Sequence, residues 1–493
     1  MKLIILYTND IHGHLASWQG WEGDHRGKTI GGLGVLGGAI AAARRKDGDC
    51  LLLDAGDLIG DTMIADLTKG KALIAAMNYL QYDALTIGNH EPDFGMSILR
   101  ERIEEANFPF IAANLVTEEE SSLFTKPYVI KQVGGVRVGI LGLAYPKTQR
   151  TTAAKNVHGI KFQSPQPVVE KFLPRLRQEG AEVVVVLSHL GLGGDQQLVR
   201  SVKGIDVIVG GHSHNRMKDA EKINDTLIVQ AGAHGSDLGI LELTIANGKI
   251  ASHRCTLILL DRDVIPTDYA ASRLAEQLLE PYRKELDEVV GQAADWLVRA
   301  QTLAGTGARK RDEESPVDSL FADILCLETK ADLAFLPGVG YGVAIPPGPI
   351  TAAQLRQLIP HDGKVVTMRL PGARIIEILE QAVENVYTDD PTVKVGGMIQ
   401  LSGLRFKYRA TNPKGHRITS VEQTTRKWNP ADDFLIATNS MLAHGGHNQE
   451  AFRHGESIRE HASQYDMIQR AFRRDSPMKT PTMGRIERVP ISQ

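Results

Sequence analysis

The sequence contains few cysteines and no long hydrophobic run. Its 493 residues include 3 cysteines, Cys50, Cys255 and Cys326. An odd number of widely separated cysteines argues against a disulfide framework and suits a reducing compartment, so we expect a cytoplasmic protein. No segment has the roughly 20 apolar residues of a membrane-spanning helix, so we expect no membrane span.

The sequence also lacks an excess of charge of either sign. Lysine and arginine number 56 against 59 acidic residues, which gives a net charge of −3. This balance gives no reason to expect nucleic acid or an anionic membrane surface as a partner. We therefore expect neither nucleic acid nor a membrane as a partner, and the sequence indicates no particular oligomeric state.

Residues 1–262 alternate between apolar strands and helices. The first apolar run, after Lys2, is too short for a signal peptide and has no cleavage site after it, so it is better interpreted as a buried strand. Continuous Val/Ile/Leu runs predict further strands that are buried on both faces. These strands are expected at 50–56, 84–88, 136–143, 181–189 and 205–211. Helical stretches at 71–80 and 98–106 lie between them, and the alternation predicts a layered α/β domain.

A linker and a second domain are expected to follow. Thr267–Val290 has apolar positions at helical spacing after Pro266, which predicts an amphipathic linker helix within residues 263–300. Residues 301–493 predict a smaller α/β domain, with helices near 316–327 and from Ala352, and a Pro/Gly-rich loop at 337–349.

Polar residues follow the predicted strands of the first domain at the points where the strands end. They are Asp10 and His12, Asp57, Asn89 and His90, His189, and His212 and His214. Active sites in open α/β sheets form at the carboxyl edge of the strands. We therefore expect these side chains to lie together.

The types of these residues favour metal ions. Asp10-x-His12 would place two ligands on one side of an extended segment, and His212-x-His214 repeats this spacing. Imidazole with carboxylate and amide oxygen suits Mn, Zn, Fe or Co. Seven ligands with one shared carboxylate would fill two sites about 3.5–4 Å apart. Any single His at a strand end is more often structural, so the joint pattern carries the prediction.

Two other features have simpler explanations. Residues 32–37 satisfy GxGxxG and open a helix, but no long buried strand directly precedes them, and Asp54 lies inside a strand. Close helix packing is therefore a better explanation than a dinucleotide site.

His14, His234 and Asp54 lie near the metal motifs. For Asp54, a structural or supporting hydrogen bond is favoured over a role in the functional site. For the two histidines, both of these roles stay open.

The motifs DIHGH, GDLIGD, GNHEPD, SHLG and GGHSH, in this order, resemble those of the calcineurin-like metallophosphoesterases of the 5'-nucleotidase branch. ESPVDSLFADIL, AIPPGPIT, IQLSGLRF and FLIATNSMLAHGG extend a looser similarity through the second half. The resemblance implies an αββα catalytic domain, a 5'-nucleotidase-like C-terminal domain that recognises substrate, and hydrolysis of phosphate monoesters by metal-activated water.

Carried over by residue, the resemblance implies two metal sites and a catalytic pair. One metal site would comprise Asp10, His12, Asp57 and His214, and the other Asp57, Asn89, His189 and His212. Asp57 would bridge the two ions. His90, paired with Asp93, would stabilise or protonate the departing oxygen.

The second half departs from the family pattern. Residues 337–342 replace an Asn-Gly-Gly-Gly-Ile-Arg loop, and Glu313 replaces an arginine expected to hold phosphate. Met398 and Gln449 align with two base-stacking aromatic residues. Candidates for a different pocket are Tyr341, His361, Arg405, His444 and His447.

Three alternatives to a nucleotidase stay open. These are a phosphatase for another phosphorylated metabolite, a hydrolase of a sulfur-containing ester, and a non-catalytic binding protein. A missing metal ligand or catalytic residue would mark the last of these, and none is missing here.

Overall fold

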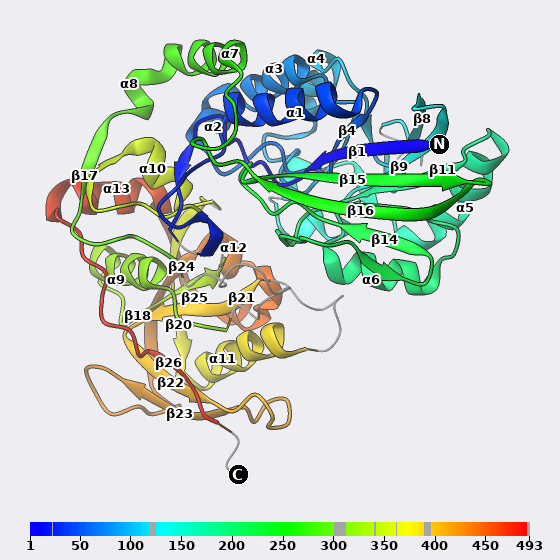
Figure 1. The fold of residues 1–493 in the computed structure, drawn as a ribbon. Coiled ribbons are helices and arrows are strands. Elements are labelled where there is room, and N and C mark those ends of the chain that lie inside the picture. The colour runs from blue at the N-terminus through cyan, green and yellow to red at the C-terminus, as the bar shows by residue number, and fades with distance from the viewer. Residues whose placement is uncertain are drawn as a thin grey trace. The chain divides into compact units, whose positions relative to one another are not determined.

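The chain folds into two compact units. The structure is a computed structural model that describes residues 1–21, 23–117, 125–152, 154–299, 312–339, 342–360, 362–388 and 396–490. One unit comprises Met1–Arg283, and the other comprises the described residues from Lys284 onward. Both are built from sheets and helices (Figure 1), so the predicted α/β class is confirmed for each.

Two six-stranded sheets form the first unit. The first has the order β16-β15-β1-β4-β5-β6 and the second β13-β14-β12-β11-β9-β8. The strands of the first sheet are β1 (Lys2–Thr8), β4 (Leu51–Asp54), β5 (Ala84–Thr86), β6 (Phe110–Ile111), β15 (Asp237–Ala246) and β16 (Lys249–Leu259). Those of the second are β8 (Tyr128–Val133), β9 (Val136–Leu143), β11 (Val183–Ser188), β12 (Val207–Gly210), β13 (Glu221–Ile223) and β14 (Thr226–Val229).

The core of this unit lies between the two sheets. Leu3 and Leu51 of the first sheet share one buried cluster with Val138, Val185 and Val207 of the second. Continuous β-branched runs suit strands covered on both faces. Helices complete the layers (Figure 1). They are α1 (Leu33–Asp47), α2 (Met63–Thr68), α3 (Lys71–Leu80), α4 (Met96–Glu105), α5 (Pro165–Gln178), α6 (Leu192–Ser201) and α7 (Tyr269–Leu279).

The glycines of the GxGxxG segment allow close helix packing. A Cβ at Gly34 would lie 2.0 Å from Ser272 Oγ, and one at Gly38, the residue directly after the segment, would lie 1.7 Å from the carbonyl oxygen of Pro266. Only glycine permits α1 to approach the start of α7 this closely. Packing is thus the role of these glycines, and the contact is with the 266–272 segment.

The predicted helix over Thr267–Val290 is shorter and broken. Helix α7 ends at Leu279, a 3-10 turn and the short α8 (Arg283–Leu286) follow, and β17 (Val289–Ala293) replaces the predicted last turn. Pro281 interrupts the helical hydrogen bonding within this segment. Helix α7 packs on α1 and α3, so it belongs to the first unit instead of serving as a free linker.

The second unit has a five-stranded mixed sheet with the order β21-β18-β24-β20-β25. Its strands are β18 (Leu333–Gly338), β20 (Lys364–Pro371), β21 (Gly397–Ser402), β24 (Asp433–Asn439) and β25 (Glu456–Ser463). Smaller sheets pair β17 with β19 (Gly348–Thr351), and β22 (Leu404–Tyr408) with β23 (Ile418–Gln423) and β26 (Ile486–Arg488). The helices are α9 (Pro316–Thr329), α10 (Ala352–Gln357), α11 (Gly372–Tyr387), α12 (Ser440–Ala443) and α13 (Gln464–Asp475). Apolar residues of α11 pack on the main sheet in a separate buried cluster.

Short elements complete the first unit. These are β2 (Trp18–Gln19), β3 (Thr29–Ile30), β7 (Leu115–Thr117) and β10 (Ile160–Phe162). Within the described residues, no helix combines the length and the apolar character needed to cross a membrane.

Candidate metal centre

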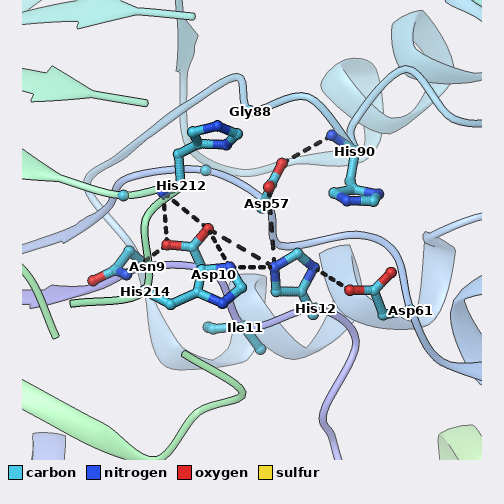
Figure 2. A network of polar contacts seen from close by, with 12 residues as sticks. Asn9, Asp10, Ile11, His12, Asp57, Asp61, Gly88, His90, His212 and His214 are labelled. Carbon is cyan, nitrogen blue, oxygen red and sulfur yellow. Dashed lines mark hydrogen bonds and ion pairs between the residues drawn. The ribbon is translucent and has the colours of Figure 1, made fainter. Parts of the chain in front are cut away.

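The chemistry-bearing residues of the first unit converge at the carboxyl ends of its parallel strands. In the first sheet, β1 runs parallel to β4, and β4 runs parallel to β5. In the second sheet, β9, β11 and β12 also run parallel to one another. The loops after β1, β4, β5, β11 and β12 carry the predicted ligands, and Figure 2 shows five of these side chains together with His90. The predicted convergence is therefore observed for six of these side chains, namely Asp10, His12, Asp57, His189, His212 and His214.

The sequence predicted that Asp10-x-His12 and His212-x-His214 each place two ligands on one side of an extended strand. This explanation is wrong. Strand β1 ends at Thr8, so Asp10 and His12 lie beyond the extended segment. Five of the predicted ligands adopt positive φ angles: Asp10 (52°), His12 (47°), Asp57 (53°), His212 (71°) and His214 (57°). Left-handed backbone is unfavourable for residues other than glycine and collects at functional sites. Tight turns, and not strand alternation, bring these side chains together.

One group of ligands surrounds Asp10. Its Oδ1 lies 3.4 Å from His214 Nε2 and 3.8 Å from His12 Nε2, and these two imidazole nitrogens are 3.1 Å apart. Hydrogen bonds also fix the carboxylate of Asp10. The backbone N–H of His212 donates to both of its oxygens, and Asn9 Nδ2 donates to Oδ2 at 2.6 Å. The side chains of Asp10, His12 and His214 could hold one ion.

A second group comprises Asp57, His189 and His212. Asp57 Oδ2 lies 3.0 Å from His189 Nε2 and 4.0 Å from His12 Nε2, so this carboxylate faces both groups. His189 Nδ1 lies 2.7 Å from the carbonyl oxygen of Ala55. That partner requires the proton on Nδ1 in the neutral ring, which leaves the Nε2 lone pair for a cation. Burial, reinforced by His189, lowers the pKa of His212 to about 3 and favours its neutral, metal-binding form.

The donor set fits divalent cations. Asp10 and Asp57 are almost fully buried, and the ion pairs they make with described residues all go to histidines. Burial alone would raise the pKa of Asp57, but His189 and His90 hold it well below its usual range. Asn89 is also buried, and its Oδ1 accepts no hydrogen bond from a described residue. Buried carboxylates without Lys or Arg partners need another positive charge.

His90 and Asp93 form a pair beside these groups. His90 Nδ1 lies 2.6 Å from Asp93 Oδ2, and the backbone N–H of His90 donates to Asp57 Oδ1 at 2.8 Å. Thr152 Oγ1 donates to the other oxygen of Asp93 at 3.0 Å. Although burial opposes protonation, the carboxylates of Asp93, Asp61 and Asp57 raise the pKa of His90 well above its usual value.

Sequence reasoning missed two buried carboxylates. Asp61 Oδ2 lies 3.0 Å from His12 Nδ1. Glu91 accepts backbone N–H groups of Asp57, Leu58, Ile59 and Gly88. Both residues lie inside the motifs GDLIGD and GNHEPD, so their position was a usable signal.

Three residues near the motifs have structural hydrogen bonds or ring contacts. Asp54 accepts from Thr8 Oγ1 at 2.6 Å and from the backbone N–H of Gly56 at 2.9 Å, as expected for a supporting residue. His14 Nδ1 lies 3.0 Å from the carbonyl oxygen of Ile11, and its ring lies 4.6 Å from that of His234. Burial lowers the pKa of His14 to about 4, so it is neutral at neutral pH.

Comparison with known proteins agrees with this geometry. Residues 3–216 match the calcineurin-like phosphoesterase family, and residues 289–454 match the 5'-nucleotidase C-terminal domain family. The chain belongs to the calcineurin-like phosphoesterases that carry a 5'-nucleotidase C-terminal domain. It is a 5'-nucleotidase-like metallophosphoesterase, and thus a metal-dependent phosphoric ester hydrolase.

Individual relatives of this metallophosphoesterase extend over most of its length. A probable 5'-nucleotidase from Treponema pallidum is 26% identical over 517 residues, which cover 90% of this chain and 86% of the relative. The crystal structure of a 5'-nucleotidase precursor from Thermus thermophilus is 27% identical, with a TM-score of 0.88 and coverage of 100% of both chains. A sulfate thiohydrolase from Thermus thermophilus, 22% identical, shares the fold with a TM-score of 0.87 over 99% of this chain and 97% of its own.

The structure gives less support to the residues predicted to bind substrate in this metallophosphoesterase than to its predicted metal ligands. Tyr341 and His361 lie outside the described residues. Arg405 and His444 are exposed, whereas His447 is partly buried and its carbonyl oxygen accepts a hydrogen bond from Asn385 Nδ2. Met398 and Gln449 are 0% and 2% exposed, so neither presents a surface on which a base could stack.

Proposed function

We propose that the protein hydrolyses phosphate monoesters with two divalent cations, drawn from Mn, Zn, Fe and Co. Asp10, His12 and His214 would hold one ion, and Asn89, His189 and His212 the other, with Asp57 shared. The observation that carries this proposal is the position of Asp57 Oδ2, 3.0 Å from His189 Nε2 and 4.0 Å from His12 Nε2. Cations there would polarise the phosphoryl oxygens and lower the pKa of a nucleophilic water.

The residues of the chain would do the remaining work. With Nδ1 of His90 engaged by Asp93, the Nε2 atom is the one that would donate a proton to the departing oxygen. Asp93 fixes the ring and stabilises its positive charge. The raised pKa of His90, caused by its three carboxylate neighbours despite burial, supports this assignment because a general acid must begin protonated.

We propose a phosphorylated small molecule as substrate, with nucleotides first and other phosphorylated metabolites second. The relatives named 5'-nucleotidase favour a nucleotide. The buried Met398 and Gln449 favour a substrate without base stacking, since each stacking contact contributes about 1–3 kcal/mol. AMP should therefore gain little over a sugar phosphate.

The test combines elemental analysis with a substrate panel. The full chain should contain two divalent ions and should release phosphate from AMP and from sugar phosphates at comparable kcat/KM. Asp57→Asn should remove turnover and loosen both ions, because the shared carboxylate is lost. A fully active Asp57→Asn protein would refute the shared role. Turnover of AMP faster by orders of magnitude would refute the inference from Met398 and Gln449 that the substrate gains nothing from base stacking, but it would not refute the metal centre.

A further inference from the structure

Asp61 contacts the proposed metal ligand His12 from the side away from the other ligands. Its Oδ2 atom lies 3.0 Å from His12 Nδ1. The other ring nitrogen, Nε2, lies 3.8 Å from Asp10 Oδ1 and 3.1 Å from His214 Nε2. Figure 2 shows Asp10 and Asp61 on opposite sides of the imidazole. The ring therefore lies between a ligand group and a separate carboxylate.

We propose that Asp61 is a positioning residue that fixes the tautomer and orientation of His12. A neutral imidazole carries one N–H, and an ionised carboxylate can only accept. Donation from Nδ1 to Asp61 leaves the Nε2 lone pair directed at the Asp10 side, where a cation would bind. This inference rests on the proposed function, because it assumes that His12 binds a metal ion.

The backbone around Asp61 is built to hold its carboxylate in place. Asp61 is 4% exposed and has a φ of 57°, a conformation that costs energy for a residue with a side chain. The backbone N–H of His12 donates to the carbonyl oxygen of Asp57 at 2.9 Å, and that of Gly13 donates to Leu58 at 2.9 Å. These bonds align the Asp57–Asp61 loop with the segment that carries His12.

The neighbouring turn is fixed by the same loop. Thr62 Oγ1 donates to the carbonyl oxygen of Gly13 at 3.3 Å and accepts from the backbone N–H of Ala65 at the start of α2. A Cβ at Gly13 would lie 2.0 Å from Thr62 Oγ1. The loop and the His12 segment are thus in direct contact on both sides of Asp61.

Asp61 has one competing role, that of a ligand to a separate ion. Ligand atoms of His12, Asp61 and His90 lie within 4.8 Å of one another. However, His90 Nδ1 is already engaged by Asp93, and His12 Nδ1 is at hydrogen-bonding distance from Asp61. The positioning role needs no further ion, so the two roles differ in metal stoichiometry.

The experiment is a titration of the metal-free full chain with Mn²⁺ in which calorimetry measures the binding. The absorption spectrum of the Co²⁺ form is a second readout. Glycine adopts the φ of 57° without strain, so Asp61→Gly keeps the turn and removes the acceptor. We expect one of the two Mn²⁺ equivalents to bind about 10–100-fold more weakly. The Co²⁺ spectrum should change because the orientation of His12 changes.

Two further variants separate positioning from a general structural effect. Asp61→Asn keeps an acceptor oxygen and tolerates left-handed backbone, so it should retain more Mn²⁺ affinity than Asp61→Gly. Lys69→Gly places a glycine at another left-handed position, the exposed end of α2 with a φ of 48°. It should bind both equivalents as the wild type does.

The outcomes discriminate between the two proposals. Wild-type affinities and an unchanged Co²⁺ spectrum in both Asp61 variants would overturn the positioning role. A third Mn²⁺ equivalent in the wild type that disappears in both variants would overturn it as well, because Asp61 would then be a ligand. Failure of the wild type to bind two ions would instead refute the proposed function on which this inference rests.

Discussion

His90 is the residue that most directly separates catalysis from metal binding. Its backbone N–H holds Asp57, whereas its side chain engages Asp93. We expect His90→Asn to leave metal content unchanged and to lower kcat by about 10²–10⁴-fold, the usual contribution of a general acid. Elemental analysis and steady-state kinetics on the same preparation would check both parts.

The alternative outcome for His90 is equally definite. If His90→Asn lost one ion, the side chain would be a ligand, and the assignment of the acid would have to move elsewhere. Thr152→Ala provides a matched control, because it removes one hydrogen bond from Asp93 and leaves the His90 contact in place. Its effect on kcat should be much smaller.

The sequence predicted which candidate ligands lie together better than it predicted the residues that contact them. Asp10, Asp57 and His212 could be found because each follows an apolar run, and the edge of a parallel sheet collects such positions. Asp61 and Glu91 follow no strand directly. Their importance depends on which backbone groups and ring atoms they meet across loops far apart in the chain, and a hydrophobic pattern carries no such information.

At the scale of elements, Glu91 ties together two of the loops that follow neighbouring strands. Its carboxylate accepts from Leu58 at 2.8 Å, beyond β4, and from Gly88 at 2.6 Å, beyond β5. Glu91→Gln would turn an NH₂ group toward backbone N–H donors and leave some of them unpaired. We expect a loss of about 1–3 kcal/mol in the free energy of unfolding, measured by denaturant titration.

A matched variant tests whether this loss comes from the loops. Glu101→Gln changes the same functional group on the exposed face of α4, and its free energy of unfolding should stay within about 0.5 kcal/mol of the wild type. Equal stability of both variants would show that Glu91 does not join the two loops.

Asp195, on α6, gives the second sheet a pH-dependent stability. Its carboxylate accepts from Ser188 Oγ, at the end of β11, at 2.5 Å, and burial raises its pKa from 3.8 to about 8. The folded state therefore binds more protons than the unfolded state between these values. The stability that Asp195 contributes falls as pH rises through this window, by up to about 1.4 kcal/mol per pH unit.

Asp195→Asn removes that titration. In the metal-free protein, the free energy of unfolding of the wild type should decline more steeply between pH 4 and pH 8 than that of the variant. Asp225→Asn, at an exposed position between β13 and β14, should keep the steeper slope. Identical slopes in the wild type and Asp195→Asn would mean that Asp195 is ionised in the folded state.

Two elements of strong periodicity were predicted with their ends, but periodicity did not predict where every element ends. The predicted helix 71–80 coincides with α3, and the predicted strand 136–143 coincides with β9. By contrast, the segment 267–290 has helical spacing throughout but ends as β17, whose Val289–Ala293 pairs with β19. Pairing with a partner some 60 residues later in the chain overrides local propensity, and the spacing of apolar residues cannot reveal it.

At the scale of the whole molecule, each unit has its own core. The two sheets of the first unit share one apolar cluster, and α11 with the main sheet of the second unit forms another. The predicted ligands all lie in the first unit. Since a domain with its own core can unfold as a unit, we expect calorimetry of the full chain to show two thermal transitions.

Removal of metal should affect one of these transitions. Ions that bind only the folded first unit stabilise it by about 2.7 kcal/mol per site at a free concentration 100 times the dissociation constant. A chelator should therefore lower the midpoint of one transition and leave the other unchanged, and added Mn²⁺ should restore it. In Asp57→Asn the chelator should have much less effect, because both ions are already loosened. Equal shifts of both transitions would contradict the placement of the ions in one unit, since the stabilisation would then extend to a core that contains none of the ligands.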